Sequence, residues 1–144
     1  MQTIEKNCSE KRNVSMFAPF CRRNGEVFVF LQKRSKTATR LPDYFGFWGG
    51  GIDAGETPEQ CLEREIKEEL NIEIESYTFL GRYEFLRKIA FVFYKEMDDG
   101  FESKITILEG DYGKWFSQQD IEKEPFLIHE DKTILLDIFN KTRL

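Results

Sequence analysis

The sequence has few cysteines, a single histidine and no long apolar run. Among its 144 residues are three cysteines, Cys8, Cys21 and Cys61. They are odd in number and lack the spacing of a metal site, which favours reduced thiols in a cytoplasmic protein. No apolar segment is long enough to span a bilayer, and the polar start MQTIEKNCSEKRN lacks the apolar core of a secretory signal. We therefore predict a cytoplasmic protein without a membrane partner.

An excess of positive charge is also missing. The chain carries 21 Lys and Arg residues against 26 Asp and Glu residues, a net charge of −5. A general affinity for nucleic-acid polymers requires a basic surface, so we expect no such partner. The acidic balance does not exclude a small anionic substrate, because a cation held by carboxylates reverses the local field.

The remaining composition is that of an ordinary globular domain. Hydrophobic residues make up 40% of the chain and charged residues 33%, which is enough for one buried core. We predict one domain over residues 1–144, in which residues 1–12 form a loosely attached tail. The 14 phenylalanines serve either this core or the face of a homodimer, and the sequence does not separate the two.

The most informative stretch runs from Gly50 to Ile72 and contains a well-marked helix. Thr57 and Gln60 form a capping-box pattern, and Pro58 occupies the first helical position, where its missing N–H costs nothing. Three apolar residues recur at i, i+4 and i+8 and would pack the helix against a core: Leu62, Ile66 and Leu70. The sequence therefore predicts a helix from Pro58 to the residue before Asn71.

Carboxylates gather on one face of this helix. Glu65, Glu68 and Glu69 lie three and four residues apart, which brings their Cβ atoms within about 5–6 Å of one another. A hard divalent cation such as Mg²⁺ would cancel the repulsion between them. The alternative is a solvated face, on which Arg64 and Lys67 form surface pairs with the glutamates. In either case the face would point toward the glycine-rich turn that precedes the helix.

The same stretch resembles the signature of the Nudix hydrolases, G-x5-E-x7-R-E-U-x-E-E-x-G-U, where U is a bulky apolar residue. The positions in register are Gly50, Glu56, Arg64, Glu65, Ile66, Glu68, Glu69 and Ile72. Asn71 stands where the family has glycine. The residue after a helix favours a left-handed conformation, for which Asn is the next-best choice. Many members also carry Pro-Gly-Gly where this chain has Gly49-Gly50-Gly51.

This resemblance implies hydrolysis of the diphosphate linkage in a nucleoside diphosphate joined to another group, with Mg²⁺ or Mn²⁺ as cofactor. The metal ligands that it implies are Glu65, Glu68, Glu69 and the carbonyl of Gly50. Glu68 or Glu65 would act as general base, because taking a proton from water requires a carboxylate within reach. Glu56 and Arg64 would form an ion pair that holds the turn against the helix.

Two residues outside the signature are also implicated by resemblance. Residues 109–115, EGDYGKW, look like the Glu-Gly-x-x-Gly-x-Trp segment of mutator-type nucleoside triphosphate pyrophosphohydrolases. This likeness implies that Glu109 adds a fourth carboxylate to the metal site, whereas by itself the residue reads as an exposed loop acid. His129 lies where the same subgroup has an asparagine that reads the base. It would either face the base or cap the last helix.

Four further residues are candidates for substrate binding. Lys33 and Arg34 follow a predicted strand, and in Nudix proteins a basic residue at this place often meets the substrate phosphates. The alternative is a solvated strand end. Residues 35–46 form a loop that is long for a compact domain. In it, Tyr44 or Phe45 would either stack on a base or only pack the loop down.

The remaining pattern predicts the fold. β-branched, aromatic or alternating apolar residues predict strands over residues 13–21, 27–31, 73–83, 89–94, 105–108 and 114–116. Asn24-Gly25 marks a hairpin turn, Pro19 is expected to weaken the end of the first strand, and residues 84–88 are either a turn or a continuation. Ser117 opens a short helical segment, and residues 129–139 have helical spacing. This order predicts an α/β (α+β) sandwich, and it resembles the Nudix fold, a mixed sheet with helices on both faces.

Several functions fit this resemblance. The Glu109 segment favours a mutator-like nucleoside triphosphate pyrophosphohydrolase, with oxidised nucleotides as possible substrates. The long aromatic loop fits a hydrolase of ADP-ribose, nucleotide sugars or dinucleoside polyphosphates equally well. A nucleotide-binding sensor without turnover is a hypothesis of another class, but such proteins usually lose signature glutamates, and this chain retains all of them. Messenger-RNA decapping is disfavoured by the acidic charge.

Overall fold

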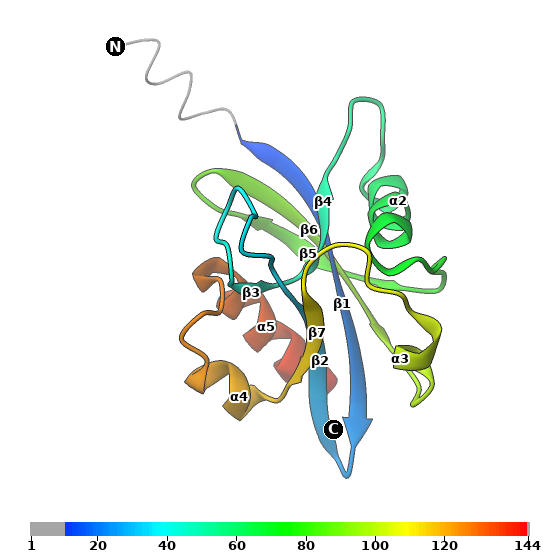
Figure 1. The fold of residues 1–144 in the computed structure, drawn as a ribbon, viewed down its shortest axis with the longest axis vertical. Coiled ribbons are helices and arrows are strands. Elements are labelled where there is room, and N and C mark those ends of the chain that lie inside the picture. Colours follow the sequence, from blue (N-terminus) through cyan, green and yellow to red (C-terminus); the bar gives the residue numbers. More distant parts are fainter. Residues whose placement is uncertain (1–10, 144) are drawn as a thin grey trace.

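A computed structural model describes residues 11–143 of the chain. The strands are β1 (Arg12–Arg23), β2 (Glu26–Lys33), β3 (Phe45–Gly46), β4 (Trp48–Gly51), β5 (Thr78–Glu84), β6 (Lys88–Glu96) and β7 (Tyr112–Phe116) (Figure 1). The helices are α2 (Pro58–Leu70), α3 (Phe101–Lys104), α4 (Gln118–Lys123) and α5 (His129–Thr142).

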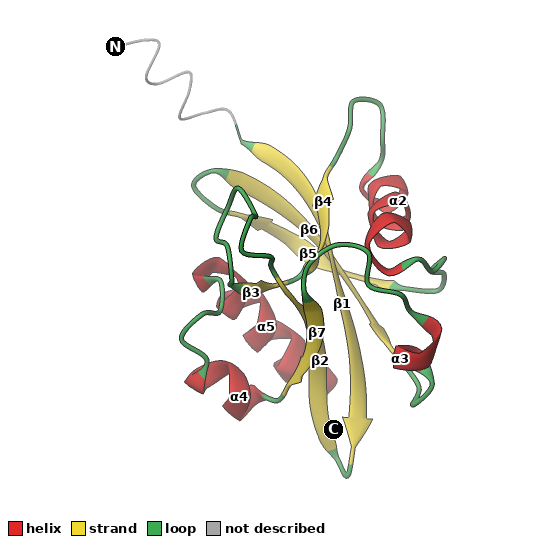
Figure 2. Cartoon of the chain, in the orientation of Figure 1, coloured by secondary structure: helices red, strands yellow, loops and turns green. Residues whose placement is uncertain are grey.

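The strands form one mixed sheet of seven strands. Five of them follow the order β3-β2-β1-β6-β5, while β4 also pairs with β1 and β7 with β2. The pair β1–β6 is parallel, and the other pairs are antiparallel. Helices cover both faces, with α2 and α3 on one side and α4 and α5 on the other (Figure 2). The predicted α+β sandwich is therefore confirmed.

Each face of the sheet has its own buried cluster. On the α2 side the predicted stripe of Leu62, Ile66 and Leu70 is fully buried and packs with Trp48 and Phe93. On the α5 side the helix buries a second stripe against strands β1, β2 and β6: Ile134, Leu135, Ile138 and Phe139. The two clusters fix α2 and α5 against opposite faces, which is what positions the site described below.

Strand β1 is longer than predicted and passes through Pro19. Its first half pairs with β4 from Val14 to Phe17, and its second half pairs with β2 from Phe20 onward. Pro19 lies in the gap between these two partners, so its missing N–H costs no ladder bond to either of them. Strand β1 therefore continues through Pro19 to Arg23, two residues past its predicted end.

The segment 105–108 is not a strand, contrary to the prediction. The amide of Thr106 donates to the Leu70 carbonyl at 3.0 Å, and the amide of Leu108 donates to the Glu69 carbonyl at 2.8 Å. These are carbonyls at the end of α2 that lack partners within the helix. The extended backbone of 105–108 therefore caps a helix instead of joining the sheet, and the short helix α3 before it was not predicted.

Other boundaries moved by a few residues. The predicted strand 73–83 begins only at Thr78. Of the undecided residues 84–88, Glu84 ends β5, Lys88 begins β6, and residues 85–87 form the turn between them. Helix α5 continues to Thr142, three residues past its predicted end. The predicted tail lies mostly outside the described residues, as does Cys8, but Arg12 already belongs to β1. Cys21 and Cys61 are free and buried.

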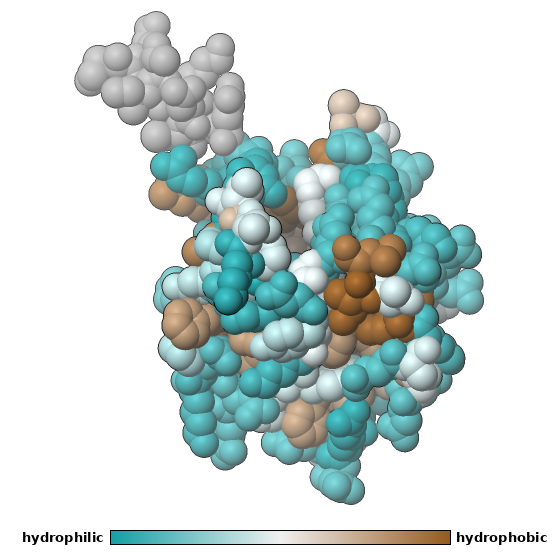
Figure 3. All heavy atoms as spheres, in the orientation of Figure 1, coloured by the Kyte–Doolittle hydropathy of each residue, from teal (hydrophilic) through white to brown (hydrophobic). Residues whose placement is uncertain are grey.

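The visible surface is mainly hydrophilic. Figure 3 shows one larger hydrophobic area on this face, near α2 and α3, where the chain between α3 and β7 crosses the end of α2. Leu108 of that segment is 57% exposed. Within residues 11–143, no helix is both long enough and apolar enough to cross a membrane.

Candidate active site

Helix α2 begins and ends as its sequence predicts. The Thr57 hydroxyl accepts from the Gln60 amide at 3.1 Å, and the Gln60 side chain accepts from the Thr57 amide at 2.9 Å, so both halves of the capping box are formed. At the other end Asn71 adopts φ 55° and ψ 37°, the left-handed conformation expected at this position. Both ends of the carboxylate-bearing helix are thus fixed by local contacts.

Residues 49–51, predicted as a turn, are instead the end of strand β4 and pair with β1. This glycine segment, called the glycine turn below, packs its backbone directly against the helix carboxylates. Gly49 has φ +130°, and a Cβ atom on it would lie 2.0 Å from the carbonyl oxygen of Ser15. A Cβ atom on Gly50 would lie 2.5–2.7 Å from the carboxyl atoms of Glu65. No other residue type fits at either position without displacing its neighbour. The buried Cys61 thiol also contacts this turn, donating to the Gly50 and Gly51 carbonyls.

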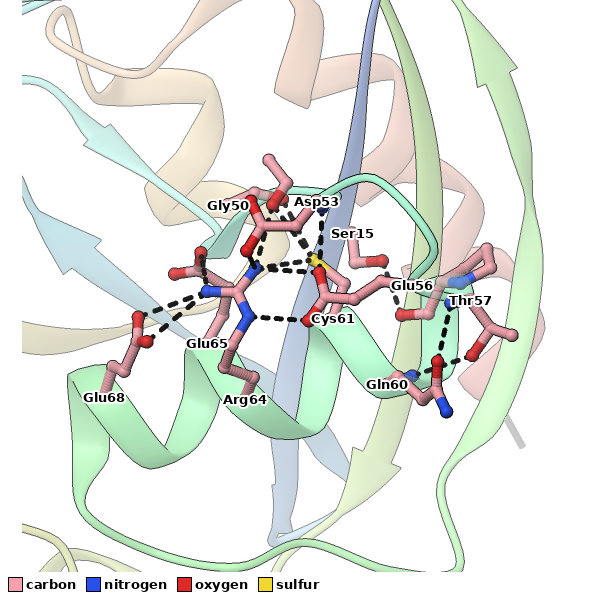
Figure 4. A network of polar contacts seen from close by, with 12 residues as sticks. Ser15, Gly50, Asp53, Glu56, Thr57, Gln60, Cys61, Arg64, Glu65 and Glu68 are labelled. Carbon is pink, nitrogen blue, oxygen red and sulfur yellow. Dashed lines mark hydrogen bonds and ion pairs between the residues drawn. The ribbon is translucent and has the colours of Figure 1, made fainter.

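Arg64 joins the turn to the acidic face (Figure 4). Its Nε and Nη2 donate to the two carboxylate oxygens of Glu56 at 2.7 and 2.9 Å, and Nη2 also donates to the Gly51 carbonyl at 3.1 Å. Nη1 donates to Glu65 at 2.9 Å and contacts Glu68 at 3.4 Å. Hydrogen bonds from Arg64 lower the pKa of Glu56 to about 2. The structure therefore contains the ion pair expected between Glu56 and Arg64.

Glu69 is the most deeply buried of the clustered carboxylates, with 4% of its surface exposed. Burial raises its pKa to about 8, and the charges of Glu65, Glu109 and Glu68 add to this, while a hydrogen bond from the Gly49 amide opposes it. The pKa of Glu65 is also raised, mainly by burial, against the lowering effect of Arg64. Buried like charges of this kind need a cation or protons to offset them.

Glu68 and Glu109 are more open to solvent. The Glu68 side chain is 49% exposed and its only described ion pair is with Arg64. Glu109 is exposed, on the loop that follows the segment capping α2, and its carbonyl accepts from the Gln32 side chain at 3.2 Å. Its charge contributes to the raised pKa values of Glu65 and Glu69, so it lies on the same side of the molecule.

The donor set fits a hard divalent cation, although the side chains are not closed around one. Within residues 11–143, no group of three or more His, Cys, Asp or Glu side chains is placed so that it could hold an ion as it stands. The guanidinium of Arg64 lies between Glu65 and Glu68 and supplies the positive charge there. Carboxylate and carbonyl oxygens are nevertheless the ligands that Mg²⁺ prefers.

A pocket of about 640 Å³ lies beside the glycine turn. Its wall includes Gly49 and Gly50, whose backbone also contacts Glu69 and Glu65. Five basic side chains and two acidic ones line it: Arg12, Arg34, Arg40, Arg87 and Lys88, with Glu130 and Asp131. The pocket is therefore basic although the whole chain has a net charge of −5. Such a pocket suits an anionic ligand that reaches the carboxylates.

Only one of the predicted substrate-binding residues lines this pocket. Arg34 does, and its Nε donates to the Arg40 carbonyl at 2.8 Å. The other four have different surroundings. Lys33 donates to the Asp43 carbonyl at 2.6 Å and lies over the Phe45 ring, and Phe45 itself is buried in the core.

Tyr44 and His129 are likewise outside the pocket wall. The Tyr44 ring packs edge-on against Phe126, and its stacking on a base stays a prediction. His129 is exposed at the first position of α5 and provides no side-chain cap. The residues from this turn that do line the pocket are Ile128, Glu130 and Asp131.

The sequence reasoning missed most of the pocket wall, including Asp131. A signal for Asp131 was present, because it lies three and four residues before Ile134 and Leu135, on the apolar stripe of α5. A charged residue on a buried helix face requires a partner or a function. The arginines at 12, 40 and 87 had no such signal, since they come from three separate segments that only the fold brings together.

Comparisons with known proteins agree with this geometry. A family model described as the NUDIX domain matches residues 11–137. The 8-oxo-dGTP diphosphatase of Escherichia coli is 31% identical over 107 residues, which cover 72% of this chain and 81% of that protein. An RNA pyrophosphohydrolase of Nitratiruptor sp. is 40% identical over 69 residues, covering 45% of this chain and 42% of that protein.

Solved structures share the fold. A MutT Nudix hydrolase from Burkholderia pseudomallei matches 90% of this chain and 99% of its own, with a TM-score of 0.70 and 25% identity. The Nudix domain of Shewanella oneidensis NrtR, solved with ADP ribose, matches 94% of this chain and 91% of its own, with a TM-score of 0.74 and 16% identity. The second likeness concerns the fold alone.

Proposed function

This chain belongs to the Nudix family of hydrolases, and we propose that its substrates are nucleoside triphosphates. The names of its relatives support a pyrophosphohydrolase activity. Hydrolysis between the α and β phosphates would give a nucleoside monophosphate and pyrophosphate. The observation that carries this proposal is the shared wall at Gly49 and Gly50. A basic pocket and a carboxylate cluster meet at these two residues, so one anionic ligand can reach both.

The carboxylate cluster would hold the metal. The candidate ligands are Glu65, Glu68, Glu69 and the Gly50 carbonyl, with Glu109 as a further carboxylate. When bound, Mg²⁺ or Mn²⁺ would act as a Lewis acid on the phosphoryl oxygens and lower the pKa of a bound water. Gly49 supports this arrangement, because its amide fixes the Glu69 carboxylate at 2.7 Å. Arg64 supports it by holding Glu65 and the turn together.

Glu68 is the better placed of the two candidate general bases. Its side chain is half exposed, whereas the Glu65 carboxylate is packed against Gly50 and bonded to Arg64. A base must approach the attacking water within hydrogen-bond distance or through one further water. Glu68 has the freedom to do so, and Glu65 serves better as a fixed ligand.

The basic side chains of the pocket wall would bind the phosphates of the substrate. Arg34 directly follows the end of β2 and Arg12 lies at the start of β1, and both line the pocket together with Gly49 and Gly50. Arginine side chains bind phosphate oxygens through two parallel hydrogen bonds. Such contacts would orient the triphosphate so that its anhydride linkage lies over the carboxylates. The apolar part of the wall is left for the base.

A second candidate substrate is the triphosphorylated 5′ end of an RNA. The reaction is the same, and the relatives named RNA pyrophosphohydrolase resemble part of this chain. Arg40 and Arg87 at the pocket wall would suit the phosphodiester that follows the first nucleotide. The net charge of −5 disfavours binding over a longer stretch of RNA.

A substrate panel with Mg²⁺ or Mn²⁺ at alkaline pH tests the proposal. The panel contains canonical and oxidised nucleoside triphosphates, a triphosphorylated oligoribonucleotide, ADP-ribose, nucleotide sugars and dinucleoside polyphosphates. Pyrophosphate released from mononucleotides supports the proposal. Turnover confined to ADP-ribose, nucleotide sugars or dinucleoside polyphosphates would replace it with the other Nudix substrate classes.

A further inference from the structure

We propose that Gln32 is a positioning residue for the metal site: its side-chain amide holds the backbone at Glu109 and so keeps the Glu109 carboxylate beside the acidic face of α2. Gln32 itself would touch neither the metal nor the substrate. This inference rests on the proposed function, because it concerns the carboxylates that would hold the metal ion. It gives a role to a buried polar side chain of β2 that belongs neither to the pocket wall nor to the carboxylate cluster.

Gln32 is a buried polar residue near the end of β2, with 5% of its surface exposed. It lies two residues after Phe30, which packs in the cluster on the α2 side of the sheet. Side chains at positions i and i+2 of a strand point to the same face, so Gln32 is directed toward α2 as well. Among residues 11–143, its side chain makes a single hydrogen bond, in which Nε2 donates to the Glu109 carbonyl at 3.2 Å. A buried amide requires such a partner, and this one belongs to the loop that carries a candidate metal ligand.

Gly110 allows this loop to approach Gln32 closely. Its φ angle is +85°, and a Cβ atom there would lie 2.7 Å from Cγ of Gln32 and 2.9 Å from the Lys33 carbonyl oxygen. Only glycine fits at this position without displacing a neighbour. The next amide, that of Asp111, donates to the same Lys33 carbonyl at 2.9 Å. Two successive residues of β2 therefore hold the chain on the C-terminal side of Glu109.

The chain on the N-terminal side of Glu109 is fixed to α2 instead. The Leu108 amide donates to the Glu69 carbonyl at 2.8 Å. Glu109 therefore lies between one hydrogen bond to α2 and two to β2, and its charge contributes to the raised pKa values of Glu65 and Glu69. Of these three bonds, only the one from Gln32 is made by a side chain, and it alone is made to Glu109 itself. We expect its loss to let the Glu109 carboxylate move away from the cluster.

The test is a double-mutant cycle of Mn²⁺ affinity, measured by calorimetry on the protein without substrate. Gln32→Met removes the donor and keeps the length of the side chain, and Glu109→Gln removes the carboxylate. Each should lower the affinity by about tenfold or more, as expected when a group that orients a metal ligand, or the ligand itself, is lost. Because Gln32 acts through Glu109, the double variant should bind no more weakly than Glu109→Gln alone. Gln118→Met on α4 is the matched control, since Gln118 accepts from Arg143 and should leave the affinity unchanged.

Gly110→Ala tests the same contact from the exposed loop and does not require the core to accept a change at Gln32. The added Cβ would push the loop away from Gln32, so the Mn²⁺ affinity should again fall by about tenfold. Gly25→Ala is the matched control, because Gly25 has a similar φ of +79° but a Cβ there meets nothing within 4 Å. This variant has the same backbone strain in the turn between β1 and β2 and should bind Mn²⁺ like wild type.

Three results would overturn the assignment. The first is a double variant weaker than Glu109→Gln by the full effect of Gln32→Met, which would show that the two residues act independently. The second is wild-type affinity in either single variant, and the third is an equal effect of Gly110→Ala and Gly25→Ala. The predicted cycle without hydrolysis of nucleoside triphosphates would support the role of Gln32 and reject only the proposed function.

Discussion

The backbone amide of Gly49 donates to Oε1 of Glu69 at a distance of 2.7 Å. This contact joins the glycine turn to the acidic face of α2 and holds a carboxylate that is almost completely buried. The position of the Glu69 carboxylate therefore depends on both the glycine turn and the helix. The turn supplies close-packed backbone that only glycine allows, and the helix supplies the charge that the turn positions.

Metal binding should depend on pH through Glu69. Its pKa is raised to about 8, so in the metal-free protein it is protonated at neutral pH and must release a proton to bind an ion. The apparent affinity for Mn²⁺ should therefore rise by up to about tenfold per pH unit until about pH 8 and then level off. Calorimetry in two buffers of different ionisation enthalpy measures the proton released. Equal affinity at pH 6.5 and 8.5 would contradict this role.

The raised pKa of Glu69 also predicts how the stability of the metal-free protein depends on pH. A carboxyl whose folded pKa lies above its unfolded value favours the folded state most when it is protonated in both states. The contribution of Glu69 to the free energy of unfolding is therefore largest below about pH 4.5 and is lost as the pH rises toward 8. Denaturant titrations of wild type and Glu69→Gln should converge at low pH and separate at high pH, with the variant more stable.

Gly50→Ala tests the close approach between turn and helix. The added Cβ would lie about 2.5 Å from the Glu65 carboxyl carbon, so the carboxylate must move. A displacement near 1 Å at a catalytic group can cost about a hundredfold in kcat. Gly51→Ala is the matched control, because a Cβ there meets nothing within 4 Å. Steady-state kinetics of the two variants should differ, and equal activity in both would show that the Gly50–Glu65 contact is unimportant.

Arg64→Lys should weaken activity without unfolding the protein. Arg64 bonds both oxygens of Glu56 while also reaching Glu65 and the Gly51 carbonyl. A lysine ammonium cannot make these contacts together. Loss of a group that orients metal ligands typically lowers activity or metal affinity by about 10–100-fold. Metal affinity and kcat measure the effect, and a variant with wild-type values in both would remove Arg64 from the site.

Thr57→Ala tests the start of α2. The loss of its side-chain cap should lower the free energy of unfolding by about 1 kcal/mol, because the Gln60 amide loses its acceptor. Thr57→Ser retains the hydroxyl and should be nearly neutral. Urea denaturation distinguishes the two, and an alanine variant as stable as wild type would show that the capping box does not stabilise this helix.

Local signals in the sequence were sufficient to predict both ends of α2. The conformation of residues 105–108 depends instead on long-range packing. The capping box and the left-handed Asn71 depend on residues a few positions apart, so both were predicted. Residues 105–108 have strand-like side chains, but their amides bond to carbonyls of Glu69 and Leu70. That choice depends on where the chain passes, and no local pattern encodes it.

The residues of the pocket likewise divide into those that the sequence could indicate and those that only the fold brings to the site. Both Arg34 and His129 were predicted from family positions. Arg34 lines the pocket, whereas His129 does not, and the pocket wall contains Asp131 from the same turn as His129. The helical stripe of α5 identifies Asp131 as facing inward, but only the fold shows that a cavity lies beside it. The roles of Glu65, Glu68, Glu69 and Glu109 in metal binding remain predictions that the experiments above address.

The most direct measurement is product analysis of one nucleoside triphosphate with Mg²⁺, run on wild type, Glu68→Gln and Glu59→Gln. Glu59 is an exposed carboxylate in the first turn of α2 and serves as the control. The account predicts pyrophosphate and nucleoside monophosphate from wild type and from Glu59→Gln. It predicts a loss of about 10²–10⁴-fold in Glu68→Gln, the range expected when a general base is removed. Release of orthophosphate instead of pyrophosphate, or wild-type turnover in Glu68→Gln, would contradict it.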